Sequence, residues 1–317
     1  MFIYLIQRTI QSIIVLFFLS VILFALIHFM PGDPLTQFKQ DNPGISQEEI
    51  ERFIKLKGLD KPYTIQYYKL ISNLVSGDFG RSSQYQVEIS TLIPRRIVTT
   101  IKLTLPVFLL SLLIAIPLGV FTALYQYSKF DYSVNLLIFI GISAPTFWLG
   151  LISIYFFSVE WNIYPASGIE TINVSSWLDE AKHFIIPIFV LSIHRIGTLV
   201  RFIRGSILEI VHLDYVRTAR AKGLSEDQVI WKHIVRNALI PLLTLVALSI
   251  PHLISGALIT EQIFGIPGMG QLMLTAIVEK DKEVALTAFL LLAILTLTFN
   301  LIADILYRLV DPRIKRA

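Results

Sequence analysis

Long stretches without a formal charge alternate with polar stretches along this chain. No Asp, Glu, Lys or Arg occurs in residues 9–32, 103–125, 132–159, 237–260 and 284–303. Each stretch is as long as the roughly 20 apolar residues that a helix needs to cross a bilayer. The pattern therefore predicts five transmembrane helices. The first is retained in the mature protein, because the apolar region of a cleaved signal peptide has only about 7–15 residues.

A sixth apolar stretch, residues 183–204, is interrupted by His194 and Arg195. A charged residue inside a span is expected to face the protein interior, water or the membrane interface. With this weaker span, the chain is predicted to be an all-α polytopic membrane protein with six transmembrane helices. Prolines inside spans are tolerated where neighbouring groups satisfy the freed carbonyls. The predicted spans contain Pro106, Pro117 and Pro145.

Residues 33–102 form the longest polar stretch and are predicted to be a small helical insert outside the membrane. Ser46 and Glu49 have the spacing of a capping box, which opens an amphipathic helix that Gly58 closes. A second helix is predicted at residues 63–75. The insert could be a loop packed over the helices or a docking surface for a partner. The predicted division is a first transmembrane helix (1–32), the insert (33–102) and a membrane core (103–317).

Residues 209–241 are polar and basic and lie between two apolar stretches. Gly223 has the position of a left-handed residue after a helix, and Ser225 with Gln228 has the spacing of a capping box. This predicts a short helix, a break at Gly223, and a second helix. Tyr215 and Ala219 are four apart and share a helix face. We expect a surface that another protein can approach closely, formed by the small residues Thr218, Ala219, Ala221 and Gly223. A charged loop that serves only membrane topology is the alternative.

Composition and charge placement support a membrane protein with both termini in the cytoplasm. Of the 317 residues, 54% are hydrophobic and only 16% are charged, whereas soluble proteins carry about 25% charged residues. With this orientation the cytoplasmic segments hold 13 Lys and Arg, and the two short external loops hold three. Cytoplasmic loops are enriched in Lys and Arg. The chain contains no Cys, which excludes disulfides and cysteine-bound metals.

The polar segment resembles the coupling segment of ABC-type importer permeases, in particular the dipeptide, oligopeptide and nickel branch. The resemblance rests on DYVRTARAKGL followed by HIVRNALIP, in which Arg217, Thr218, Ala219 and Gly223 match the branch motif. A Leu-Pro pair of the general motif is replaced here by Val235-Arg236. Further motifs that resemble the branch are MPGDP (30–34), GLDKP (58–62), GDFGRS (77–82), APTFWLGL (144–151), GIPGMG (265–270) and DPRIK (311–315).

The resemblance implies a permease subunit of the prokaryotic plasma membrane, of the type with a long first external loop. It implies as partners a second homologous permease, two ATPase subunits and an extracytoplasmic substrate-binding protein, with lipid around the helices and no nucleic acid. The coupling segment (206–241) would insert into a cleft of an ATPase through Asp214, Tyr215, Arg217, Thr218, Ala219, Arg220, Lys222 and Gly223. The external gate or pathway would include Glu261, Gly265, Pro267, Gly268 and Gly270.

The chain has none of the motifs of an ATPase or hydrolase. It contains no G-x-x-x-x-G-K-[ST] phosphate loop, no H-E-x-x-H and no G-x-S-x-G. ATP hydrolysis is therefore expected on partner chains, with no enzyme activity, cofactor or metal site here. An intramembrane enzyme would need paired carboxylates or a Ser/His set, and an ion-coupled transporter usually carries acids in its spans and repeated halves. No paired carboxylates and no Ser/His set stand out in the predicted spans, and Asp and Glu are absent from the span centres.

Peptides are the expected cargo, with nickel or a metal chelate as the alternative. A bare divalent cation favours clustered His or carboxylate ligands, whereas the spans contain only the isolated His28, His194 and His252. We interpret each of these as a helix-packing residue rather than a metal ligand. A chelated metal would need no ligands from the pathway, so the residues alone leave the metal-chelate alternative open.

Overall fold

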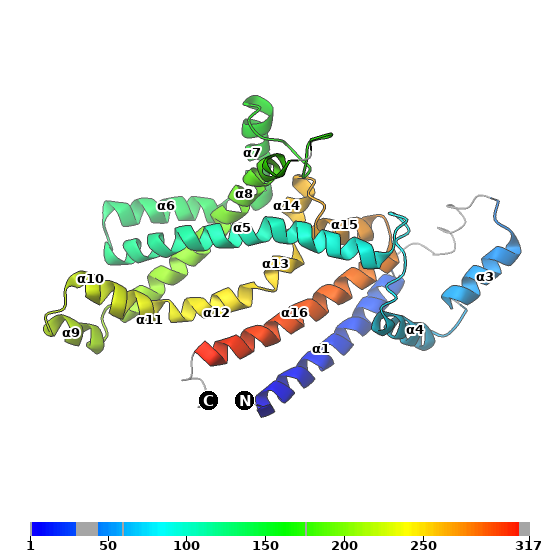
Figure 1. Ribbon diagram of the computed structural model, residues 1–317, viewed down its shortest axis with the longest axis horizontal. Coiled ribbons are helices and arrows are strands. Elements are labelled where there is room, and N and C mark those ends of the chain that lie inside the picture. The colour runs from blue at the N-terminus through cyan, green and yellow to red at the C-terminus, as the bar shows by residue number, and fades with distance from the viewer. Residues whose placement is uncertain (1, 30–43, 59, 175, 311–317) are drawn as a thin grey trace. The chain divides into compact units, whose positions relative to one another are not determined.

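The computed structural model describes residues 2–29, 44–58, 60–174 and 176–310 of the chain (Figure 1). These residues are mostly helical, and their β-type pairing consists of one isolated antiparallel bridge between Arg81 and Glu88. The predicted all-α class is therefore confirmed. The motifs at residues 30–34 and 311–315 lie outside the described residues.

The chain divides into two compact units. The first comprises Met1–Arg96 and Leu272–Leu295, and the second comprises Ile97–Gln271 and Thr296–Ala317. The division falls inside three helices: α5 (Ile89–Leu124), α15 (Met269–Val278) and α16 (Lys282–Val310). The chain therefore passes between the units through continuous helices rather than through loops.

In the first unit, the insert packs a helix against the N-terminal helix. The helices are α1 (Phe2–Phe29), α3 (Gln47–Lys57) and α4 (Tyr63–Ser76). The predicted capping box at Ser46 is confirmed, as is the left-handed Gly58 that ends α3. The hydroxyls of Ser20 on α1 and Tyr67 on α4 share a hydrogen bond of 2.7 Å. The ends of α3 are thus set by local capping, and α4 is held by contact with α1.

The turn that follows α4 is tied to the start of α16 within the same unit. Ser82 donates its hydroxyl hydrogen to Asp281 Oδ2 at 2.6 Å, and the backbone N–H of Gln84 reaches the same oxygen at 3.2 Å. Ser82 and Asp281 are both buried. The GDFGRS motif therefore includes a residue that anchors the insert to a helix about 200 residues later in the chain.

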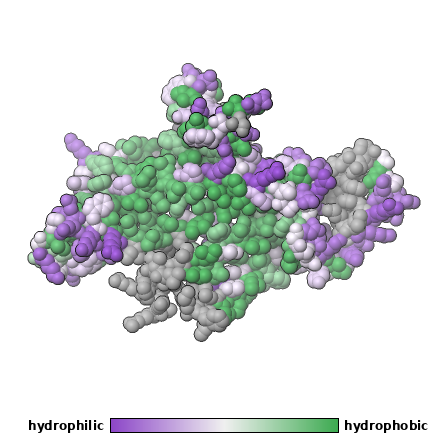
Figure 2. Space-filling view, in the orientation of Figure 1, coloured by the Kyte–Doolittle hydropathy of each residue, from purple (hydrophilic) through white to green (hydrophobic). Residues whose placement is uncertain are grey.

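Two long helices, α5 and α8 (Trp177–Ile210), form much of the second unit. α5 begins at Ile89 rather than at the predicted residue 103, because the charged residues Arg95, Arg96 and Lys102 lie within the helix and do not end it. In Figure 1, α5 and α6 (Lys129–Ser143) run side by side. Figure 2 shows hydrophobic residues over these helices, as a lipid-facing surface requires.

Residues 132–159 were predicted as one transmembrane helix, but the structure has two helices with a bend between them. α6 ends at Ser143, and the chain resumes as α7 (Thr146–Ser153) and the π-helical η1 (Ile154–Glu160) after a bend of 95°. Pro145 causes the break, because it has no N–H and disfavours a helical conformation at the preceding residue. Ala144 accordingly has an extended backbone, with ψ 127°.

The predicted continuous span over residues 237–260 is also interrupted. It consists of α11 (Arg236–Ala238), α12 (Ile240–Ser249), α13 (His252–Ser255) and α14 (Leu258–Ile263). Pro251 lies at one interruption and Gly256, with φ +85°, at another. Among the described residues, four helices are long and apolar enough to cross a membrane, or five if the bent pair is one span. The predicted count of six transmembrane helices is therefore not exactly confirmed by the described residues.

Candidate functional site

The coupling segment is a short helix, a reversal and a second helical stretch. α9 (Asp214–Ala221) ends before Gly223, whose φ of +77° is left-handed as predicted. The chain continues as α10 (Glu226–Gln228) and the π-helical η2 (Val229–Val235). The predicted capping box at Ser225 does not form, because the Ser225 side chain makes no cap hydrogen bond. The reversal therefore depends on the glycine rather than on the serine.

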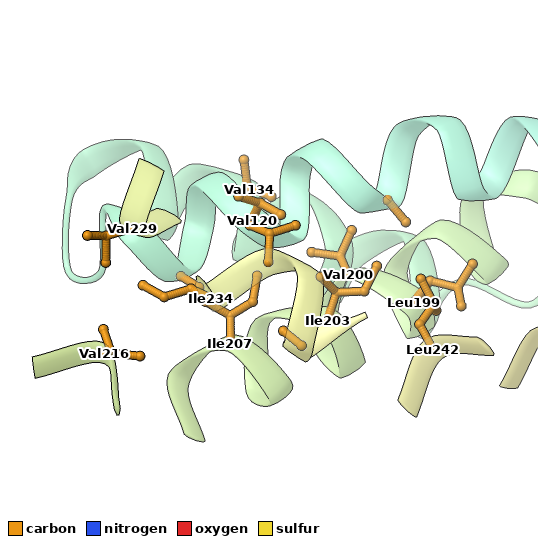
Figure 3. Close-up of a cluster of buried hydrophobic side chains, with 14 of the residues drawn as sticks. Val120, Val134, Leu199, Val200, Ile203, Ile207, Val216, Val229, Ile234 and Leu242 are labelled. Carbon is orange, nitrogen blue, oxygen red and sulfur yellow. The ribbon is translucent and has the colours of Figure 1, made fainter. Parts of the chain in front are cut away.

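One face of α9 is buried in the core of the second unit. Val216 is 0% exposed and Ala219 is 5% exposed. Figure 3 shows Val216 near Ile207 at the end of α8 and near Ile234 of η2, in one hydrophobic cluster. Ala219 belongs to the same cluster, so the expectation that it forms part of an approachable small-residue surface is corrected. Val216 and Ala219 are three residues apart and therefore share a helix face. This face of α9 points into the core.

The rest of the α9 surface and the turn after α9 are exposed. The sequence-predicted residues there are Asp214, Tyr215, Arg217, Thr218, Arg220, Ala221, Lys222 and Gly223. Tyr215 is therefore exposed although it lies one helical turn from the buried Ala219. Figure 2 shows hydrophilic residues over α9 and α10. Two exposed apolar residues that sequence reasoning missed, Leu213 and Leu224, flank this face. Large apolar side chains next to a polar segment are a signal that could have found them, since exposed hydrophobic groups often mark a contact surface.

Two ion pairs order the charged groups of the segment. The guanidinium group of Arg220 contacts Glu226 at 2.6 Å, and Arg217 lies 3.7 Å from Asp214. The hydrogen bond from Arg220 lowers the pKa of Glu226 and raises the pKa of Arg220. The Arg220–Glu226 pair bridges the reversal, because its members lie on either side of Gly223. It holds α10 against the end of α9 although both side chains are about half-exposed.

An ion pair between a partly exposed arginine and a buried aspartate fixes the helix that precedes α9. Arg204 on α8 donates from Nε and Nη2 to the two carboxylate oxygens of Asp131 at 3.1 and 3.0 Å. Asp131 also accepts hydrogen bonds from Asn135 and from the backbone N–H of Tyr127. Sequence reasoning did not identify this pair, because its members are 73 residues apart. The forked geometry orients α6 relative to α8 and so gives α9 a rigid base.

The second group of sequence-predicted residues surrounds a buried carboxylate. Glu261 on α14 is 0% exposed. It accepts hydrogen bonds from the Thr100 hydroxyl at 2.9 Å and from the backbone N–H groups of Gln271 and Ala257 at 2.9 and 3.3 Å. Thr100 in turn accepts from the N–H of Met269 at 2.8 Å. The carboxylate thus joins α5, α14 and the start of α15 within the second unit.

The turn at residues 265–270, here called the glycine turn, wraps closely around Glu261. A Cβ on Gly268 would lie 2.4 Å from the Glu261 carboxyl carbon, and one on Gly270 would lie 2.6 Å from the Leu258 Cα. Gly265 has a left-handed φ of +59°. Gly268 and Gly270 are buried, while Gly265 and Pro267 are half-buried. The structure therefore brings all five predicted gate residues together, with Glu261 inside the turn rather than on a surface.

The described residues contain no group of three or more His, Asp or Glu side chains that could hold a metal ion. His28 packs against Tyr63 in the first unit, with ring centroids 4.3 Å apart. His194 and His252 lie on separate helices of the second unit.

Family models match almost the whole chain. Residues 115–316 match the family described as binding-protein-dependent transport system inner membrane component, and residues 1–104 match the N-terminal part of such membrane components. The coupling segment and the glycine turn lie in the first of these regions, and the insert lies in the second.

Curated relatives match end to end. The chain is 41% identical over 314 residues to the oligopeptide transport system permease protein AppB of Bacillus subtilis, which covers 98% of this chain and 99% of AppB. It is 34% identical over 319 residues to the dipeptide transport system permease protein DppB of Escherichia coli, which covers 94% of each. A chain of the MetNI methionine ABC transporter in inward-facing conformations is similar in fold, with a TM-score of 0.56 and 20% identity. That match covers 69% of this chain and 96% of the other.

Proposed function

The chain belongs to the family of inner membrane components of binding-protein-dependent transport systems, and from that premise we propose that it is a permease subunit for peptide import. It is a multi-pass membrane protein and not an enzyme, and ATP hydrolysis belongs to a separate chain of such systems. The observation that carries the proposal is the coupling segment, which is anchored by one buried face and presents an exposed polar face.

We propose that the exposed face of α9 docks into a cleft of an ATPase subunit. Leu213 and Leu224 would supply apolar contacts, and Arg217 and Lys222 would supply the charge. Burial of Val216 and Ala219 ties α9 to the membrane helices, so that a displacement of α9 is passed to α8 rather than absorbed by a loose loop. Such coupling needs packed elements with two discrete arrangements. The full assembly would contain a second permease, two ATPases and a substrate-binding protein.

The docking proposal is tested by the same substitution at two exposed alanines. Ala221→Trp changes the exposed face of α9, and Ala181→Trp changes an exposed position near the start of α8. We expect Ala221→Trp to reduce co-purification of the ATPase and peptide uptake, and Ala181→Trp to reduce neither. Normal uptake with the ATPase still bound to the Ala221→Trp protein would contradict docking through this face.

The proposed orientation places both termini and the coupling segment in the cytoplasm. It is supported by the excess of Lys and Arg in the segments assigned to that side. A reporter that is active only in the cytoplasm should then be active when it is fused after Ala317. A tag at Asn42 should be accessible from outside intact cells. Both positions lie outside the described residues. A protected tag at Asn42 would contradict this orientation.

The proposed cargo is a peptide of a few residues. The end-to-end similarity to AppB and DppB supports this choice over nickel or a metal chelate. The deciding measurement is uptake by the reconstituted complex of labelled di- to pentapeptides, compared with nickel and a metallophore complex. We expect peptide import alone. Import of the metal complex without peptide import would replace the proposed cargo but leave the docking proposal standing.

A further inference from the structure

Two buried polar side-chain atoms have no hydrogen-bond partner among the described residues, and both lie on α8. They are Ser192 Oγ and Arg195 Nε. The two residues are three apart, so they lie on one side of the helix about one turn from each other. A buried polar group without a partner typically costs about 1–3 kcal/mol, and more if it is charged. Such a pair in the middle of a membrane helix indicates that another molecule supplies the missing hydrogen-bond acceptor.

Among the described residues, Arg195 Nε has no hydrogen-bond partner, and the guanidinium contacts an aromatic ring instead. Its Cζ lies 4.9 Å from the ring centroid of Phe108 on α5. Contact with an aromatic face stabilises a cation in an apolar setting. Arg195 is partly buried as a residue, and its Nε is fully buried. Within the described residues the charge is therefore positioned against an aromatic ring with no paired carboxylate.

The same stretch of α5 also contacts an interrupted helix. Thr104, one turn before Phe108, donates its hydroxyl hydrogen to the Leu253 carbonyl at 2.6 Å. Leu253 is in α13, between the interruptions at Pro251 and Gly256. Non-helical backbone at membrane depth occurs where it is buried in protein or lines a water-filled cavity, and transporters use such broken helices at their substrate sites. Charged residues inside spans likewise mark substrate pathways.

We propose that Ser192 and Arg195 form a carboxylate-binding site in the translocation pathway, where they contact the C-terminal carboxylate of a peptide in transit. A guanidinium presents paired N–H donors that match the two oxygens of a carboxylate, and the serine hydroxyl adds a third donor. Phe108 orients the guanidinium. This assignment rests on the proposed function in one respect, namely that the cargo is a peptide with a free carboxyl end.

The test compares a tripeptide with its C-terminal amide in the complete complex reconstituted in liposomes. Arg195→Gln removes the charge of the proposed site, and Arg201→Gln removes the charge of an exposed arginine on another side of the same helix. The same binding protein serves every variant, so its own preference for acid or amide cancels when each variant is compared with the unmodified complex. We expect Arg195→Gln to lower uptake of the acid about tenfold, as loss of a charge-assisted contact implies. Uptake of the amide should stay unchanged.

Further variants and outcomes make the test decisive. Ser192→Ala should lower uptake of the acid less than Arg195→Gln does, and Arg201→Gln should leave the ratio of acid to amide uptake unchanged. Equal loss of acid and amide uptake in Arg195→Gln, or no loss of either, would overturn the site. Failure of the Arg195→Gln subunit to assemble with the second permease would show that Arg195 pairs with that subunit, and would also overturn it. If the unmodified complex imports neither peptide, the proposed function itself fails.

Discussion

The coupling segment and the glycine turn are held in place by opposite means, although both belong to the second unit. The coupling segment is anchored by apolar residues, with Val216 and Ala219 in the core and the charged groups outside. The glycine turn is anchored by a buried carboxylate, with Glu261 inside and glycines around it. The first arrangement leaves a polar surface available to another protein. In the second arrangement, the Glu261 carboxylate is used up by hydrogen bonds inside the protein.

Because of this difference, the two regions respond differently to small displacements. An apolar anchor is non-directional and tolerates small shifts of the helix that it holds. A carboxylate that accepts three hydrogen bonds requires its donors at fixed positions, and the absence of a Cβ at Gly268 and Gly270 permits their close approach. The coupling segment is therefore suited to transmit a displacement, and the glycine turn is suited to resist one.

The largest expected effect comes from overfilling the glycine turn. Gly270→Ala would place a Cβ 2.6 Å from the Leu258 Cα and 2.8 Å from its backbone nitrogen. Because backbone cannot rotate away, we expect a destabilisation of about 3 kcal/mol or more. The measurement is the thermal unfolding midpoint of the purified subunit. Gly205→Ala on α8 is the control, since a Cβ there meets nothing within 4 Å. A midpoint for Gly270→Ala equal to that of the control would show that the turn is loosely packed.

The next effect in size comes from replacing the buried carboxylate of Glu261 with an amide. Glu261→Gln keeps the shape of the side chain but turns an NH2 group towards donors such as the Gln271 or Ala257 N–H. We expect a loss of about 2–3 kcal/mol, because a buried donor is then left without an acceptor. Thermal unfolding measures this as well. The exposed Gln262→Glu on the same helix provides a control that should change little. An unaltered midpoint in Glu261→Gln would mean that the hydrogen bonds contribute no net stability.

A smaller effect distinguishes the two faces of α9. Ala219→Leu overfills the hydrophobic cluster, and we expect it to lower stability by about 1–2 kcal/mol. Ala221→Leu, on the exposed face, should leave stability unchanged. Thermal unfolding of the isolated subunit separates these effects from ATPase docking, which requires the complex. Equal midpoints for the two variants would show that the apolar anchor is absent in solution.

The smallest effect is the pH dependence of the ion pair that bridges the reversal. Because Arg220 lowers the pKa of Glu226 below its ordinary value, the pair stabilises the folded state at neutral pH. This contribution is lost as the pH falls through the lowered pKa, when the carboxylate of the folded state is protonated. Both side chains are substantially exposed, so we expect only about 0.2–1 kcal/mol. The unfolding midpoint between neutral and acid pH should fall slightly more for the unmodified protein than for Glu226→Gln. An identical fall would assign the pair no role in stability.

Local sequence rules predicted much of the fold and of the candidate site. The capping box at Ser46 and the left-handed residues Gly58 and Gly223 follow from a few neighbouring residues, and the structure has them. Prolines within long apolar stretches differ in their structural effect. Pro145 bends its span by 95°, whereas Pro187 lies inside the continuous α8. The same residue type can break a helix or be absorbed by it, and the surrounding packing decides which.

Hydropathy along the sequence indicates the membrane class and the polar segment at residues 209–241, because it acts within short stretches of chain. The residues around Glu261 were singled out by the family resemblance and not by hydropathy. The tertiary structure fixed which face of α9 is buried, since Val216 and Ala219 turn inward to meet residues of α8 and η2. It also decided that Glu261 is an internal anchor. The carboxylate receives the Thr100 hydroxyl from 161 residues away, and no local pattern encodes a contact between residues so far apart in the chain.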